Sequence, residues 1–116
     1  MLCSEIREIL AEEEDVQRRK EALDSLICRR AKLLCESLEE RMRRMQQDNG
    51  EWRHLSQQEC AGLHKEEQLY LKSQLNRLRH EQGRTKGRLA ELRRLKARAK
   101  LIRAAEVASE RKRQRH

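Results

Sequence analysis

Two side chains in the middle of the sequence have the types and spacing of a metal-binding pair. Cys60 and His64 are four residues apart, so on a helix both would lie on one face, and His54 comes six residues before Cys60. Structural zinc takes four ligands in closely spaced pairs, and the sequence has no second pair of this kind. The simpler interpretation is a surface histidine near a half-buried cysteine. We therefore predict no metal and no other cofactor.

Catalytic motifs are absent from the sequence as well. It contains no glycine-rich phosphate loop, no GxSxG elbow, no HExxH helix and no DxD cluster. Long helices also provide no deep pocket that would perturb a pKa or exclude water. We expect no enzymatic activity, no catalytic residues and no small-molecule substrate.

The strongest chemical signal is the basic C-terminal end. Residues 84–116 hold 13 Lys and Arg against 3 Asp and Glu, a net charge of +10 in a chain whose total is +8. Three uses of this end compete, namely nuclear import, binding of nucleic-acid phosphates and binding of an acidic protein surface. The basic patch consists of Arg93, Arg94, Lys96, Arg98, Lys100, Arg103, Arg111, Lys112, Arg113 and Arg115.

The order of the segments argues against a sequence-specific leucine-zipper DNA-binding protein. In that family the basic region precedes the zipper, whereas here the leucines come first. Non-specific phosphate contact stays open, although aromatic residues make up only 2% of the chain and offer little base stacking. Ten residues separate Lys100 from Arg111, which resembles the spacing of a bipartite nuclear-import signal.

Composition predicts an all-α chain without a closed globular core. Charged residues make up 41% of the 116 residues, there is no Phe or Pro, and the abundant residues are strong helix formers. Disorder is the alternative for so polar a chain, but leucine periodicity disfavours it. The sequence has no long apolar run, and its first fifteen residues include six Asp and Glu. We expect an intracellular protein, cytoplasmic or nuclear, that is neither secreted nor membrane-spanning, with its four cysteines kept as thiols.

A leucine heptad from Leu71 to Ile102 organises the chain. Alternating steps of four and three give the row Leu71, Leu75, Leu78, Gln82, Thr85, Leu89, Leu92, Lys96 and Ala99. A second row runs through Leu92, Leu95, Ala99 and Ile102, so the apolar face widens towards the C-terminus. We predict that the apolar members form an oligomer seam with partner helices: Leu71, Leu75, Leu78, Leu89, Leu92, Leu95, Ala99 and Ile102.

The N-terminal part repeats the same spacing less cleanly. Its apolar row is interrupted by Glu13, Lys20 and Arg30, and its face is broadest around residues 23–38. We predict a second contact there, formed by Leu23, Ile27, Leu34 and Leu38.

Asn49-Gly50 is the best candidate break, because both residues tolerate left-handed backbone angles. A helical hairpin hinged there competes with one long or kinked helix, and the latter is favoured because two residues are few for an antiparallel connection. Trp52, just after the break, is expected to pack in the seam. The predicted fold is an elongated coiled coil with an acidic helical segment at 1–48, an irregular helical segment at 49–70, the leucine coiled coil at 71–103 and a basic tail at 104–116.

The charge gradient adds an expectation about pairing. Residues 1–48 hold 10 Lys and Arg against 12 Asp and Glu, a net −2. Antiparallel pairing would therefore bring opposite charges together. We expect a protein-interaction subunit or adaptor of a larger assembly, cytoskeletal or nuclear, that forms homo- or hetero-oligomers. The alternative is a basic nucleic-acid-associated protein dimerised by its coiled coil.

Overall fold

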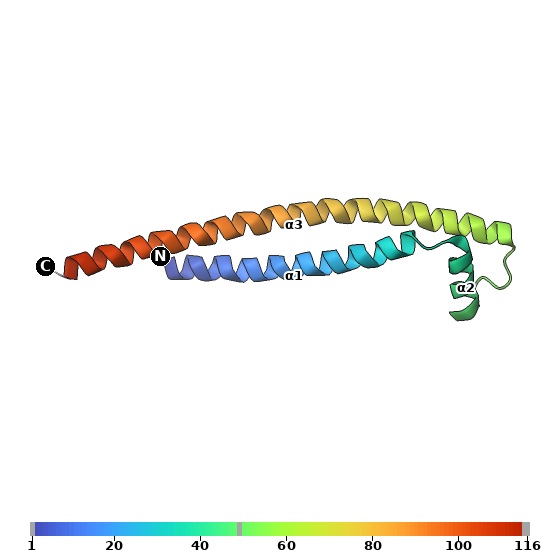
Figure 1. The fold of residues 1–116 in the computed structure, drawn as a ribbon, viewed down its shortest axis with the longest axis horizontal. Helices are drawn as coiled ribbons and strands as arrows, with labels where there is room; N and C mark the ends of the chain where they lie inside the picture. Colours follow the sequence, from blue (N-terminus) through green and yellow to red (C-terminus); the bar gives the residue numbers. More distant parts are fainter. Residues whose placement is uncertain (1, 49, 115–116) are drawn as a thin grey trace. The chain divides into compact units, whose positions relative to one another are not determined.

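The structure, a computed structural model, describes residues 2–48 and 50–114 and consists of three α-helices (Figure 1). Helix α1 spans Leu2–Leu34, α2 spans Leu38–Asp48 and α3 spans Gln57–Gln114. The predicted all-α class is confirmed. Among the described helices, none combines the length and the apolar character needed to cross a membrane.

The chain folds back on itself instead of forming the one long or kinked helix that the sequence favoured. The predicted N-terminal segment contains an extra helix end at Leu34, and the connection around Gly50 runs to Ser56 before α3 begins. Gly50 adopts a φ of 65°, the left-handed conformation that favours glycine, so a break does occur there. Asn49 lies outside the described residues. Residues 35–56, which include the short helix α2, connect α1 to α3. This connection is long enough for an antiparallel hairpin, whereas two residues would be few.

Serine caps fix where the second and third helices begin. The Glu40 backbone N–H donates to Ser37 Oγ at 3.1 Å at the start of α2. At the start of α3, the Glu59 N–H donates to Ser56 Oγ at 3.1 Å, and the Ser56 N–H donates to Glu59 Oε1 at 3.2 Å. The second arrangement is a reciprocal capping box, which satisfies two backbone donors that the helix itself leaves unpaired.

The described chain divides into two compact units, and α1 and α3 contribute to both. The first unit contains residues 2–22 of α1 and 82–114 of α3. Within it, α1 and α3 run antiparallel, side by side (Figure 1). Val16 of α1 and Leu89 and Leu92 of α3 are buried together, with Ile9 packed against them. The acidic start of the chain therefore lies along the basic part of α3.

The second unit contains residues 23–81 and is built around α2. Met45 at the end of α2, Trp52 in the following loop and Cys60 in α3 are buried against one another, with Leu38, Met42 and Leu55 packed around them. This cluster is the reason that the loop after α2 is held in place. Trp52 is therefore buried near the break, but against Met45 and Cys60 and not in the leucine seam where it was expected.

Candidate functional site

The C-terminal end of α3, residues 100–114, is uncovered. Every one of these residues is exposed, whereas Ala99 directly before them is buried. Continuing the four-three spacing from Ala99 places Arg103, Glu106, Glu110 and Arg113 on the face that α1 would cover. These side chains offer no apolar surface to bury, so the paired part of α3 ends where its seam becomes charged.

Apolar side chains nevertheless occur on the uncovered end. Leu101 is 73% exposed, Ile102 40% and Val107 38%. A shallow groove runs along this stretch and is lined by cations together with small and apolar residues. Its lining residues are Lys100, Arg103, Ala104, Val107, Ala108, Arg111 and Lys112. Exposed apolar groups next to cations are the features of a surface that receives an amphipathic partner.

The basic patch divides into engaged and available cations. Lys96 Nζ lies 2.8 Å from both carboxylate oxygens of Glu13, and Arg93 Nη2 donates to Gln17 Oε1 at 3.4 Å. Arg103 also takes part in an interaction. Arg115 lies outside the described residues. The remaining six form no ion pair or hydrogen bond with any residue that the structure describes: Arg94, Arg98, Lys100, Arg111, Lys112 and Arg113.

Arg88 is a cation that the predicted basic patch omitted. Its Nε donates to Glu12 Oε1 at 2.9 Å, and its Nη1 lies 3.2 Å from a Glu91 oxygen. Hydrogen bonds to the Glu12 and Glu91 carboxylates raise the pKa of Arg88. Because all three side chains are well exposed, these contacts align α1 with α3 more than they stabilise the fold.

The predicted oligomer seam is covered within the chain over most of its length. Leu71, Leu75, Leu89, Leu92 and Ala99 are buried and Leu78 is half-buried, and the polar row members Gln82, Thr85 and Lys96 are also buried or half-buried. Leu89 and Leu92 pack on Val16 of the same chain. Leu95 and Ile102, the outer members of the second row, are each 40% exposed.

The predicted second contact is divided between two places. Leu23 is buried, and Ile27 and Leu34 are half-buried in α1. Leu38 belongs instead to α2, where it packs on the Met45–Trp52–Cys60 cluster. The break after Leu34 therefore separates Leu38 from the other three.

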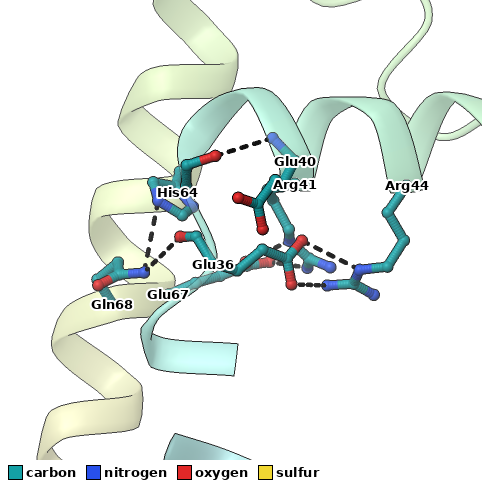
Figure 2. Close-up of polar contacts among 8 residues, drawn as sticks. Glu36, Glu40, Arg41, Arg44, His64, Glu67 and Gln68 are labelled. Atoms are coloured by element: carbon teal, nitrogen blue, oxygen red, sulfur yellow. Dashed lines mark hydrogen bonds and ion pairs between the residues drawn. The ribbon is translucent and has the colours of Figure 1, made fainter. Parts of the chain in front are cut away.

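A polar network joins α2 to α3 in the second unit (Figure 2). Arg41 of α2 donates to Glu67 of α3 through Nε at 2.7 Å and Nη2 at 2.5 Å. Arg44 donates to both oxygens of Glu36 at 3.1 and 3.2 Å. The Arg41 guanidinium carbon also lies 5.1 Å from the centre of the Trp52 ring. Both arginines are thus held by paired hydrogen bonds, the strong geometry for this ion pair.

A hollow of about 330 Å³ lies next to this network. We call it the Arg30 hollow. Its walls come from the end of α1, from α2 and from α3, and combine three arginines with two glutamates and several apolar groups. The lining residues are Arg30, Leu33, Glu36, Arg41, Arg44, His64, Glu67, Gln68, Tyr70 and Leu71.

Cys60 and His64 have separate surroundings. Cys60 is fully buried in the apolar cluster with Met45 and Trp52. His64 Nε2 lies 3.4 Å from Gln68 Nε2, which also donates to the Glu36 carbonyl. Among the described residues no group of three or more His, Cys, Asp or Glu could hold a metal ion. The exposed thiols of Cys28 and Cys35 are free.

No family model, curated protein or solved structure matches this chain. Its function must therefore be argued from the surfaces described above. Sequence reasoning missed Arg41, Arg44 and Glu67, because they come together only when α2 turns against α3. Two Ser-x-x-Glu patterns, at Ser37 and at Ser56, are the sequence signal for the starts of α2 and α3.

Proposed function

We propose that this chain is a non-enzymatic protein-interaction subunit in which a helical hairpin presents the uncovered end of α3 to an acidic amphipathic helix of a partner protein. The observation that carries the proposal is the combination of exposed apolar groups and available cations on one helical segment. Leu101, Ile102 and Val107 are exposed beside Lys100 and Arg111.

The length of this segment supports a helical partner. Fifteen residues, 100–114, correspond to about 22 Å at 1.5 Å per residue, or roughly four turns. A helix of this length gains little stability by itself in water, and most helical stability comes from packing of an apolar face. A partner that covers Ala104, Val107 and Ala108 would supply that packing, and its carboxylates would meet the cations that line the same groove.

Nucleic-acid binding is the second candidate, and the six available cations favour it. Phosphate contact requires only positive charge and leaves the apolar groups in water. Exposed Leu101, Ile102 and Val107, with Glu106 and Glu110 among them, fit a protein partner better. A protein partner would cover these apolar side chains, whereas phosphate contact would leave them in water.

Binding to two defined probes tests the proposal. One is a labelled three-heptad peptide with leucine at positions a and d and glutamate at e and g. The other is a mixed-sequence DNA duplex of about 20 base pairs. Ala104→Gln combined with Val107→Gln should weaken peptide binding about tenfold or more, because both changes place a polar side chain in the groove and one removes its largest apolar group. Leu69→Gln, at an exposed leucine outside the uncovered end, is the control and should change nothing.

Salt dependence separates the alternatives. Affinity for the duplex should fall steeply and log-linearly with salt if phosphates are the natural target, whereas affinity for the peptide should fall less steeply, because apolar contacts, which respond weakly to salt, carry part of it. Failure to bind the peptide, or equal binding by the double variant, would overturn the proposal. Tight, sharply salt-dependent duplex binding without peptide binding would establish the nucleic-acid alternative.

A further inference from the structure

Three charged residues interrupt the apolar row of α1, and they differ in how their charge is satisfied. Glu13 is paired with Lys96, itself a charged interruption in the row of α3. Lys20 also has an interaction partner. Arg30 is half-buried and makes no hydrogen bond or ion pair with any residue that the structure describes. It is the exception among the three.

The Arg30 guanidinium is available to bind an anion. Arginine stays charged at every physiological pH, and although Arg30 has no hydrogen-bond partner among the described residues, none of its nitrogens is fully buried. Arg30 lines the Arg30 hollow together with Arg41 and Arg44. The other two are each neutralised by paired hydrogen bonds, to Glu67 and to Glu36 (Figure 2).

The charges around the hollow select the kind of anion that fits. Three arginines against two glutamates leave a single positive charge, carried by Arg30. Glu36 and Glu67 would repel a second negative charge, so a monoanion is favoured over a phosphate dianion. Leu33 of α1 and Tyr70 of α3 are both exposed and add apolar surface to the lining of the hollow. A volume of about 330 Å³ is at the small end of ligand sites.

We propose that the Arg30 hollow binds one carboxylate carried next to an apolar group, namely a Glu or Asp side chain adjacent to a leucine-like residue in a partner polypeptide. The carboxylate accepts hydrogen bonds from the Arg30 guanidinium, and the apolar neighbour packs on Leu33 and Tyr70. This site is in the second unit and does not depend on the uncovered end of α3. It therefore goes beyond the proposed function and can fail or succeed independently of it.

His64 is not the donor that we assign to the carboxylate. Its Nε2 already contacts the Gln68 amide nitrogen at 3.4 Å, and its Nδ1 is buried without a hydrogen-bond partner among the described residues. Surrounding side chains cover that atom, so a ligand in the hollow would not reach it without moving the ring. Recognition of the anion thus depends on Arg30 alone, which makes one substitution decisive.

Titration of the full-length, isotope-labelled chain with three probes tests this site by NMR. The probes are acetyl-Leu-Glu-Leu-amide, its Gln analogue acetyl-Leu-Gln-Leu-amide, and inorganic phosphate. The Glu peptide should shift the Leu33 methyl and Tyr70 ring resonances saturably. Its affinity should exceed that of the Gln analogue about tenfold, the ratio expected for one charge-assisted hydrogen bond. Phosphate should bind more weakly than the Glu peptide.

Two matched variants complete the experiment. Arg30→Gln should abolish the preference for the Glu peptide, whereas Arg29→Gln, at the exposed neighbour, should leave it unchanged. Arg30→Gln should also melt no lower than the parent, because Arg30 makes no hydrogen bond or ion pair with a described residue that the change would break. Equal affinities for the Glu and Gln peptides, tighter binding of phosphate, or an unchanged preference in Arg30→Gln would each overturn the proposal. The comparison of peptides on the parent chain decides the matter even if the variant melts lower.

Discussion

Leu92→Ala tests whether the antiparallel packing in the first unit is formed within one chain. Leu92 is 1% exposed and packs with Val16 and Leu89. Truncating a fully buried leucine costs roughly 2–5 kcal/mol. The cluster is a thin layer between two helices, so neighbouring side chains can partly fill the space, and we expect about 2.5 kcal/mol. Leu101→Ala, at a leucine that is 73% exposed, should cost less than about 0.5 kcal/mol.

The change should be measured as a melting temperature by circular dichroism at two protein concentrations tenfold apart. With about 2.1 cal/mol/K of unfolding entropy per residue, a chain of 116 residues loses roughly 10 °C for that free energy. If Val16 of the same chain covers Leu92, the melting temperature should not depend on concentration. A melting temperature within 2 °C of the parent, or one that rises with concentration, would refute the packing described here.

Four further substitutions and one exchange measurement probe the remaining elements. Gly50→Ala should cost about 1 kcal/mol or more in thermal unfolding, because the left-handed φ is strained for alanine and the new Cβ would lie 3.1 Å from Arg53. Gly83→Ala, in open space on α3, should instead stabilise by about 0.5–1 kcal/mol, and destabilisation there would contradict the helix. Lys96→Met should cost about 1–2 kcal/mol in urea unfolding, and adding Glu13→Leu should recover most of it, since a half-buried pair is costly mainly when one partner is left alone. The Gly50 amide should exchange with solvent much faster than that of Leu75, and equal protection would argue for a continuous helix.

The periodicity of α3 was readable from the sequence because it depends only on local spacing. Every member of the row from Leu71 to Ala99 is buried or half-buried, including Gln82, Thr85 and Lys96, which interrupt its apolar character. Burial follows the four-three register whatever helix provides the cover. The same pattern therefore could not say whether that helix comes from another chain or from residues 2–34 of this one.

The charge gradient was equally ambiguous for the same reason. Acidic residues 1–48 and basic residues 84–116 attract one another between two chains or within one. The length of the connection between the two helices decides between the two possibilities. Asn49-Gly50 alone gives a connection of only two residues, which is few for an antiparallel turn. Two Ser-x-x-Glu capping patterns, starting at Ser37 and Ser56, mark additional helix starts and lengthen the turn.

The polar sites of the second unit depend on tertiary packing, which no local pattern encodes. Arg41 and Glu67 are twenty-six residues apart and meet only because α2 packs its Met45 and Leu38 onto Cys60 of α3. Neither residue belongs to a motif, and both are unremarkable in a chain that is 41% charged. The Trp52 ring beside Arg41 was placed near the break by its sequence position, but its contact with a guanidinium was not predictable.

Charged interruptions of a heptad row carry information that apolar positions do not. A leucine can pack against any apolar neighbour, so the leucines specify burial without specifying a partner. Glu13 requires an opposite charge, and Lys96 is the interruption in α3 that supplies it, so this pair helps to fix which residues of α1 and α3 meet. Arg30 lies by contrast with Leu78, Gln74 and Glu81 in one hollow and with Leu33 and Tyr70 in another, and it forms no ion pair with any carboxylate that the structure describes. An accessible cation at a seam position that pairs with no described residue can accept an anion from outside, which is the basis for the ligand that we propose for Arg30.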